Sequence, residues 1–66
     1  MTNKIKVQRA IKDISQEQLA QAIGVSRQTI NTMEKNKYVP STVLALKIAK
    51  YFGVAVEEVF FLEETD

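Results

Sequence analysis

The amino-acid sequence predicts an all-α fold of five short helices and allows a short β-ribbon at the C-terminal end. Apolar residues recur along most of the chain at the three- and four-residue spacing of a helix face. Serines of the kind that cap helix starts precede three of these runs, at Ser15, Ser26 and Ser41. Only two Gly and one Pro stand among the 66 residues, so few positions interrupt helices. A chain this short forms a single domain, over residues 1–66.

The first helix is expected over residues 4–12. Ile5 and Arg9 lie four residues apart on one of its faces, and Val7 and Ile11 form an apolar pair on another. The second pair leaves an apolar strip that a small core does not need.

The second and third helices are expected over residues 16–23 and 27–34, joined by three residues. Ser15 with a Gln three positions later forms a capping-box pattern, and Ser26 is placed to cap the third helix. Gly24 directly follows the second helix, where a residue that tolerates positive φ is favoured.

The fourth helix is expected over residues 42–52, between Ser41 as its cap and Gly53 at its end. A basic loop, residues 35–40, separates it from the third helix. A short fifth helix is expected over residues 56–60, because two glutamates stand in its first turn, where carboxylates complement the helix dipole.

Small and apolar residues within 16–34 have the spacing of a helix-turn-helix, counted from Gln16 as the first position. They are Leu19, Ala20, Ile23, Val25, Ile30 and Met33. Two helices that cross steeply over a short turn bring their backbones close together at Ala20, where a methyl group fits and a larger side chain would not. The other apolar residues close the wedge between the two helices.

The outward face of the third helix is polar. With about 100° between successive residues, Gln28 and Thr32 point directly away from the buried side. The side chains expected on or beside this face are Arg27, Gln28, Asn31, Thr32 and Lys35. Arg, Gln, Asn and Thr can recognise base edges, and the N-terminus of a helix favours phosphate. The alternative is a solvated polar face that has no partner.

Glu34 is the one carboxylate on the third helix, and it lies on the side turned toward the first helix. Arg9 is its expected partner in an ion pair. The alternative is two independent surface charges.

The formal net charge of +1 conceals two regions of opposite sign. Residues 1–50 carry all nine Lys and Arg with three acids, a net charge of +6, whereas residues 51–66 carry five acids and no base. The basic region is therefore a candidate surface for a polyanion. The alternative is an ordinary polar surface followed by an acidic tail.

Composition argues against several other functions. Without Cys or His the chain has no disulfide, lacks the commonest zinc ligand and lacks the commonest general base, so no metal, cofactor or catalytic site is expected. No small-molecule ligand is expected. No apolar run is long enough for a signal peptide or a membrane span, so we expect a soluble cytoplasmic protein associated with the nucleoid and no membrane partner.

The run from Ser15 to Lys35, followed by Pro40-Ser41 and Ile48-Ala49, resembles the Cro and phage-repressor type (Xre-like) of helix-turn-helix transcriptional regulator. The resemblance covers about residues 4–60 and is strongest to small stand-alone bacterial regulators such as the cytolysin repressor. It implies a five-helix domain. It also implies a symmetric homodimer on a palindromic double-stranded DNA operator.

The resemblance also implies roles for individual residues. The residues that would contact bases are Arg27, Gln28, Asn31 and Thr32. The residues that would contact phosphates are Gln16, Ser26, Lys35, Asn36 and Lys37. The resemblance supports a structural ion pair in which Arg9 and Glu34 brace the first helix against the third.

Three positions depart from the family pattern. Asn36 stands where glycine is common, so a left-handed turn is expected there. Ala55 stands where Ser or Thr usually caps the last helix, so that helix is expected to be short or frayed. Ile11 is apolar at a position that is usually polar.

The C-terminal end, residues 56–64, is the candidate dimer interface. Its apolar residues are Val56, Val59, Phe60, Phe61 and Leu62, more than a short helix and tail can bury alone. We expect a homodimer built on the fifth helix, with residues 60–63 in an extended ribbon. The alternative is a tail that folds back over Val7 and Ile11 of the same subunit.

These features favour a DNA-binding transcriptional regulator that acts as a repressor by occluding a short operator, with a recognition helix, residues 27–34, in the major groove. A protein-interaction module, such as an antitoxin-like subunit, is the second hypothesis. An enzyme is the remote third hypothesis, because the chain has no carboxylate pair in an evident cleft.

Overall fold

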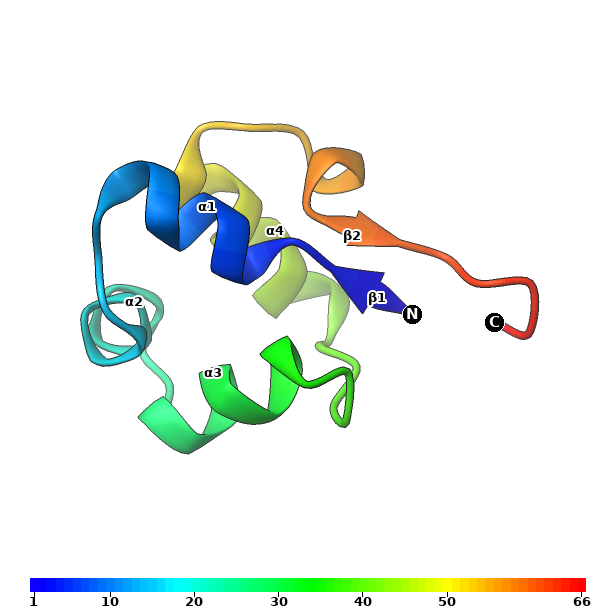
Figure 1. Ribbon diagram of the computed structural model, residues 1–66, viewed down its shortest axis with the longest axis horizontal. Helices are drawn as coiled ribbons and strands as arrows, with labels where there is room; N and C mark the ends of the chain where they lie inside the picture. The colour runs from blue at the N-terminus through cyan, green and yellow to red at the C-terminus, as the bar shows by residue number, and fades with distance from the viewer.

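Four α-helices and a two-stranded ribbon make up the chain, and the computed structural model describes all 66 residues. The helices are α1 (Ile5–Lys12), α2 (Gln16–Ile23), α3 (Arg27–Glu34) and α4 (Thr42–Phe52), followed by one 3-10 turn, η1 (Val56–Glu58). The strands β1 (Thr2–Asn3) and β2 (Phe60–Phe61) pair antiparallel, with Thr2 opposite Phe61. In Figure 1 both strands and both chain ends lie at one end of the molecule, and α2 lies at the other.

The three capping serines act at the expected helix starts. The Oγ atoms of Ser15, Ser26 and Ser41 each accept a hydrogen bond from the backbone N–H three residues later, at 3.0, 3.1 and 3.2 Å. Gly24 and Gly53 end α2 and α4 with φ of 85° and 72°, the left-handed conformation that glycine adopts at little cost. The bounds expected for these three helices are therefore confirmed.

The expected fifth helix over residues 56–60 is wrong, and the α-helix count is four. Ala55 has no side-chain oxygen to cap a helix, and only the turn Val56–Glu58 forms. Beyond that turn the chain becomes extended, because the carbonyl of Val59 accepts a hydrogen bond from the Lys4 N–H at 2.8 Å and Phe60 pairs with Asn3. Pairing with the N-terminal segment thus replaces the last helix.

The core draws residues from every helix. Its largest fully buried side chains are Ile5, Leu19, Ile30, Met33, Ile48 and Val59. Ile30 and Met33 anchor α3 to this core and leave its opposite side open to solvent.

The apolar strip on α1 stays uncovered. Val7 is 50% exposed and Ile11 is 71% exposed, because the C-terminal segment runs along β1 and does not fold over them. The longest helix has 11 residues, and none has the length and apolar character needed to cross a bilayer.

Candidate nucleic-acid interface

The solvent-facing side of α3 gathers the side chains expected to meet bases. Arg27 and Gln28 are exposed, whereas Asn31 and Thr32 are half-buried. Arg27, Gln28 and Asn31 line an open hollow of about 310 Å³ that has no apolar residue in its lining. A surface of this kind offers hydrogen-bond donors and acceptors together with one fixed positive charge.

The start of α3 is preorganised by its cap. Ser26 Oγ lies 2.9 Å from Thr29 Oγ1 and also accepts the Thr29 N–H, so the Ser26 side chain is held over the first turn. The backbone N–H groups of Arg27 and Gln28 precede the first hydrogen bonds of the helix ladder. Such groups and the helix dipole together attract an anion.

Thr32 offers fewer hydrogen-bonding groups to solvent than its position on the helix suggests. Its hydroxyl lies 3.0 Å from the carbonyl oxygens of both Gln28 and Thr29, so its proton is donated to the backbone of its own helix. The methyl group of Thr32 and its hydroxyl oxygen, as an acceptor, remain available to another molecule.

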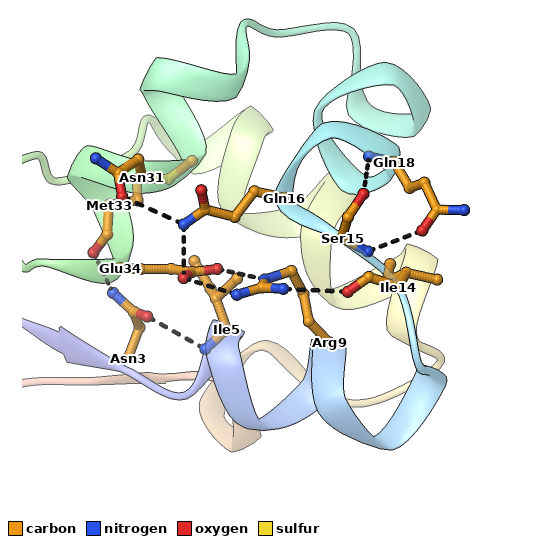
Figure 2. Close-up of polar contacts among 10 residues, drawn as sticks. All are labelled: Asn3, Ile5, Arg9, Ile14, Ser15, Gln16, Gln18, Asn31, Met33 and Glu34. Atoms are coloured by element: carbon orange, nitrogen blue, oxygen red, sulfur yellow. Dashed lines mark hydrogen bonds and ion pairs between the residues drawn. The ribbon is translucent and has the colours of Figure 1, made fainter.

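A polar network joins α1, α2 and α3 behind this face (Figure 2). Arg9 donates to Glu34 through Nε at 2.6 Å and Nη2 at 3.0 Å, and Arg9 Nη1 donates to the Ile14 carbonyl at 3.1 Å. The hydrogen bond to Glu34 raises the pKa of Arg9 above its usual value. The side chains of Arg9 and Glu34 are only 15% and 8% exposed, so the charge of Glu34 is compensated inside the molecule.

Gln16 completes the network from the first turn of α2. Its Nε2 donates to Glu34 Oε1 at 3.1 Å and to Asn31 Oδ1 at 3.3 Å. The side-chain amide is therefore turned toward α3, and the Gln16 backbone N–H is left as the group that can meet a phosphate at this helix start.

The loop after α3 holds three exposed polar residues, Lys35, Asn36 and Lys37. Asn36 has φ of 59°, which confirms the expected left-handed turn. The Lys37 N–H donates to the Thr32 carbonyl at 3.0 Å, so this turn folds back on the end of α3. Both lysine side chains extend from a backbone that is held in place.

Asn3 is a residue that sequence reasoning missed. Its Nδ2 donates to the Met33 carbonyl at 2.7 Å and to Asn36 Oδ1 at 3.3 Å, while its Oδ1 accepts from the Ile5 N–H at 3.2 Å. Asn3 thereby connects β1 to the end of α3. An Asn just before a helix suggests a local hydrogen bond, but no sequence signal links it to a carbonyl 30 residues away.

The five apolar residues of the C-terminal end have different surroundings. Val59 and Phe60 are buried in the core of the subunit, Val56 and Phe61 are half-buried, and Leu62 is 81% exposed. The ammonium group of Lys4 lies 5.3 Å from the centre of the Phe61 ring. Of this set, Leu62 and the open side of Phe61 are the most accessible to another chain.

Comparison with known proteins identifies the family that this chain resembles. A family model described as helix-turn-helix matches residues 5–59. The chain is 53% identical to an uncharacterized HTH-type transcriptional regulator of Methanocaldococcus jannaschii, with both chains covered fully, and 53% identical to the uncharacterized HTH-type transcriptional regulator YgzD of Bacillus subtilis, with 97% of each chain covered. It is 34% identical to the cryptic phage CTXphi transcriptional repressor RstR of Vibrio cholerae, covering 98% of this chain and 59% of RstR.

No three His, Cys, Asp or Glu side chains form a group that could hold a metal ion. The candidate DNA-binding site consists of a polar helix face, its supporting ion pair and a basic loop. Together with the match over residues 5–59, these features show that the chain belongs to the Cro and phage-repressor type of helix-turn-helix transcriptional regulators, a family whose members bind DNA.

Proposed function

We propose that this protein is a transcriptional repressor that binds a short palindromic operator as a homodimer, with α3 in the major groove. The observation that carries the proposal is the outward side of α3, which is polar and free of uncompensated acid. Glu34, the single carboxylate of α3, is held by Arg9. A polyanion can therefore approach α3 without meeting a negative charge on that helix.

Base recognition is assigned to Arg27, Gln28, Asn31 and Thr32. Arg27 suits the two acceptors of guanine, and Gln28, which has no side-chain hydrogen bond within the protein, suits the donor and acceptor of adenine. The Thr32 methyl group suits the methyl group of thymine, because the Thr32 proton is already donated to the backbone.

Phosphate binding is assigned to Gln16, Ser26, Lys35, Asn36 and Lys37. Gln16 and Ser26 stand at the starts of α2 and α3, where backbone N–H groups are free, and the lysines add positive charge beyond the end of α3. These contacts would fix the register of α3 on the duplex and carry no sequence information themselves.

The homodimer is assigned to the C-terminal end, residues 56–64, with its apolar residues Val56, Val59, Phe60, Phe61 and Leu62. Since Val59 and Phe60 support the subunit core, direct contact between subunits would fall mainly on Phe61 and Leu62. A twofold dimer places two recognition helices on half-sites about 34 Å apart. Repression would follow from occlusion of the operator, an action consistent with the name of the relative RstR.

Selection of random duplexes by the purified protein, followed by footprinting, tests the proposal. We expect enrichment of two inverted half-sites separated by one helical turn, with protection on one face of the duplex. A single asymmetric site would contradict the homodimer, and no enrichment of any sequence would contradict specific recognition.

A protein-interaction module is the second candidate, because Val7 and Ile11 expose an apolar strip on α1. If this second function holds, the double substitution Val7→Asp and Ile11→Asp should abolish repression in cells, while the purified protein should still select the same duplexes. Repression that survives this double substitution would exclude the protein-interaction module.

A further inference from the structure

We infer that Asn3, on β1, positions the side chain of Asn36 for binding to a DNA phosphate. Asn3 would not contact DNA itself. It would hold Asn36 so that the NH₂ group of Asn36 faces outward and can donate to a phosphate oxygen. This inference rests on the proposed function, because it specifies how one of the proposed phosphate contacts is arranged.

The Asn3 amide has one orientation that satisfies its neighbours. Its Oδ1 accepts from the Ile5 N–H at 3.2 Å, and its Nδ2 donates to the Met33 carbonyl at 2.7 Å (Figure 2). A backbone N–H can only donate and a carbonyl can only accept, so a reversed amide would lose both bonds. The Asn3 backbone is held as well, because Asn3 stands opposite the buried Phe60 in the β-ribbon. Asn3 is therefore a fixed donor at the end of α3.

The same NH₂ group orients the side chain of Asn36. An amide nitrogen carries two protons, and Asn3 Nδ2 lies 3.3 Å from Asn36 Oδ1 in addition to its bond with Met33. A donor at this place favours the oxygen of Asn36 and leaves the NH₂ group on the other side of that amide. Asn36 is exposed, and its NH₂ group donates to no atom of the protein. Its two N–H groups are therefore available to a ligand that accepts hydrogen bonds.

The backbone of the turn is tied to the same end of α3. The Asn36 N–H donates to the Met33 carbonyl at 3.0 Å, and the Lys37 N–H donates to the Thr32 carbonyl at 3.0 Å. The last carbonyls of a helix carry a partial negative charge, which opposes the approach of a phosphate. The bonds from the turn and from Asn3 offset this charge, because they place donors on those carbonyls.

The neighbours of Asn36 in the turn are suited to a phosphate. Lys35 and Lys37 are both exposed, and neither takes part in an ion pair within the protein. Phosphate oxygens carry negative charge and accept hydrogen bonds, so two ammonium groups and one amide NH₂ group complement them.

Titration of labelled duplexes tests the inference with the wild type, Asn3→Ser, Asn36→Gly and the double variant. Asn3→Ser removes the NH₂ group but keeps an oxygen that can accept from the Ile5 N–H. Asn36→Gly removes the amide and adopts the left-handed turn without steric cost. Thr2→Ser is the matched control, because it introduces the same residue at the neighbouring position of β1. Circular dichroism confirms at the working temperature that each variant is folded.

Asn3→Ser and Asn36→Gly should each weaken binding by about fivefold, to operator and unrelated duplexes alike, because a phosphate contact carries no sequence information. The double variant should also be about fivefold weaker than the wild type, since Asn3 acts through Asn36. A role of Asn3 in stability alone would give two independent losses, which multiply to about 25-fold in the double variant. Thr2→Ser should bind like the wild type.

Two results of this titration would overturn the inference while leaving the proposed function intact. One is unchanged binding by a folded Asn3→Ser, and the other is a double variant in which the two losses multiply. A measurement on the wild type covers the case in which Asn3→Ser does not fold. The side-chain NH₂ signals of Asn36 in the NMR spectrum should shift when either duplex is added, and unshifted signals would overturn the inference. Failure of the wild type to select any duplex sequence would instead contradict the proposed function.

Discussion

The α2–α3 region and the C-terminal end of this protein are specified in different ways. Each helix of the first region is started by a serine that hydrogen-bonds three residues ahead, and Gly24 makes the turn between them. The C-terminal end forms no α-helix, and its strand β2 exists by pairing with β1, at the other end of the chain. The first region is encoded locally, whereas the second depends on contacts between distant segments.

The two regions also differ in the contacts that stabilise them. Behind α3, a network of charged and amide groups adds to the anchoring of Ile30 and Met33 in the core. The C-terminal end is held instead by Val59 and Phe60 in the core, by its pairing with β1 and by ion pairs of the N-terminal ammonium group with Glu63 and Asp66. The proposed DNA surface is therefore preorganised within one subunit. The proposed dimer surface is what remains exposed once the subunit core has been completed.

The largest effect on stability is expected from a substitution that breaks the polar network of the α2–α3 region. Arg9→Ala leaves Glu34 buried without its cation, so the free energy of unfolding should fall by about 3 to 5 kcal/mol. Thermal or urea denaturation measures this loss. Lys6→Ala, on the exposed side of the same helix, is the control and should change stability by less than about 0.5 kcal/mol. Similar small losses in both variants would mean that the ion pair does not brace α3.

The next largest effect is expected on DNA binding, where two substitutions distinguish base recognition from general attraction to DNA. Gln28→Ala should weaken binding to the selected operator by about 1 to 3 kcal/mol and leave binding to unrelated duplexes unchanged. Lys37→Ala should weaken binding to all duplexes alike and reduce the slope of log K against log salt by about 1. Equilibrium titrations at several salt concentrations distinguish these patterns. An identical response of both variants would contradict the assignment of separate roles.

A third substitution tests the C-terminal end alone. Leu62→Asp places a charge on an exposed apolar residue among several acids, so it should weaken dimerisation by about 2 kcal/mol with little loss of subunit stability. Sedimentation equilibrium gives the mass, and operator binding should weaken with it. Ile11→Asp, on the exposed strip of α1, is the control and should keep the dimer. A dimer unaffected by Leu62→Asp would place the interface elsewhere.

The smallest expected effect compares the two helix-ending glycines. An added Cβ meets no atom within 4 Å at Gly24 or at Gly53, so only the positive φ opposes alanine. Gly24→Ala and Gly53→Ala should each lower the free energy of unfolding by about 1 kcal/mol, measured by urea denaturation. A much larger loss at Gly24 would mean that the turn carries a constraint beyond its backbone conformation.

Sequence reasoning predicted most of the α2–α3 region because the relevant signals are short in range. Ser15, Ser26 and the periodic apolar residues lie within one or two turns of the structure they determine. Even the approach of Arg9 to Glu34 follows from which side of each helix faces the core. The further bonds of Gln16 did not follow, since amide hydrogen bonds between helices depend on side-chain conformations.

The C-terminal end could not be predicted in the same way. Residues 56–60 fit a short helix by composition, but the energy of pairing with Thr2–Asn3 is not visible in a local stretch of sequence. Asn3 is a similar case, because its hydrogen bond to Met33 crosses the fold. Contacts between segments far apart in the sequence determined both outcomes.

Chemical-shift mapping of the backbone amides during titration with a selected operator duplex would locate the DNA-binding surface of this protein. We expect the largest changes at residues 26–37 and at the start of α2, around Gln16. Residues 56–64 should change little, because the C-terminal end is assigned to the second subunit and not to DNA. Largest changes along residues 56–64, or at Val7 and Ile11 on α1, would contradict recognition through α3.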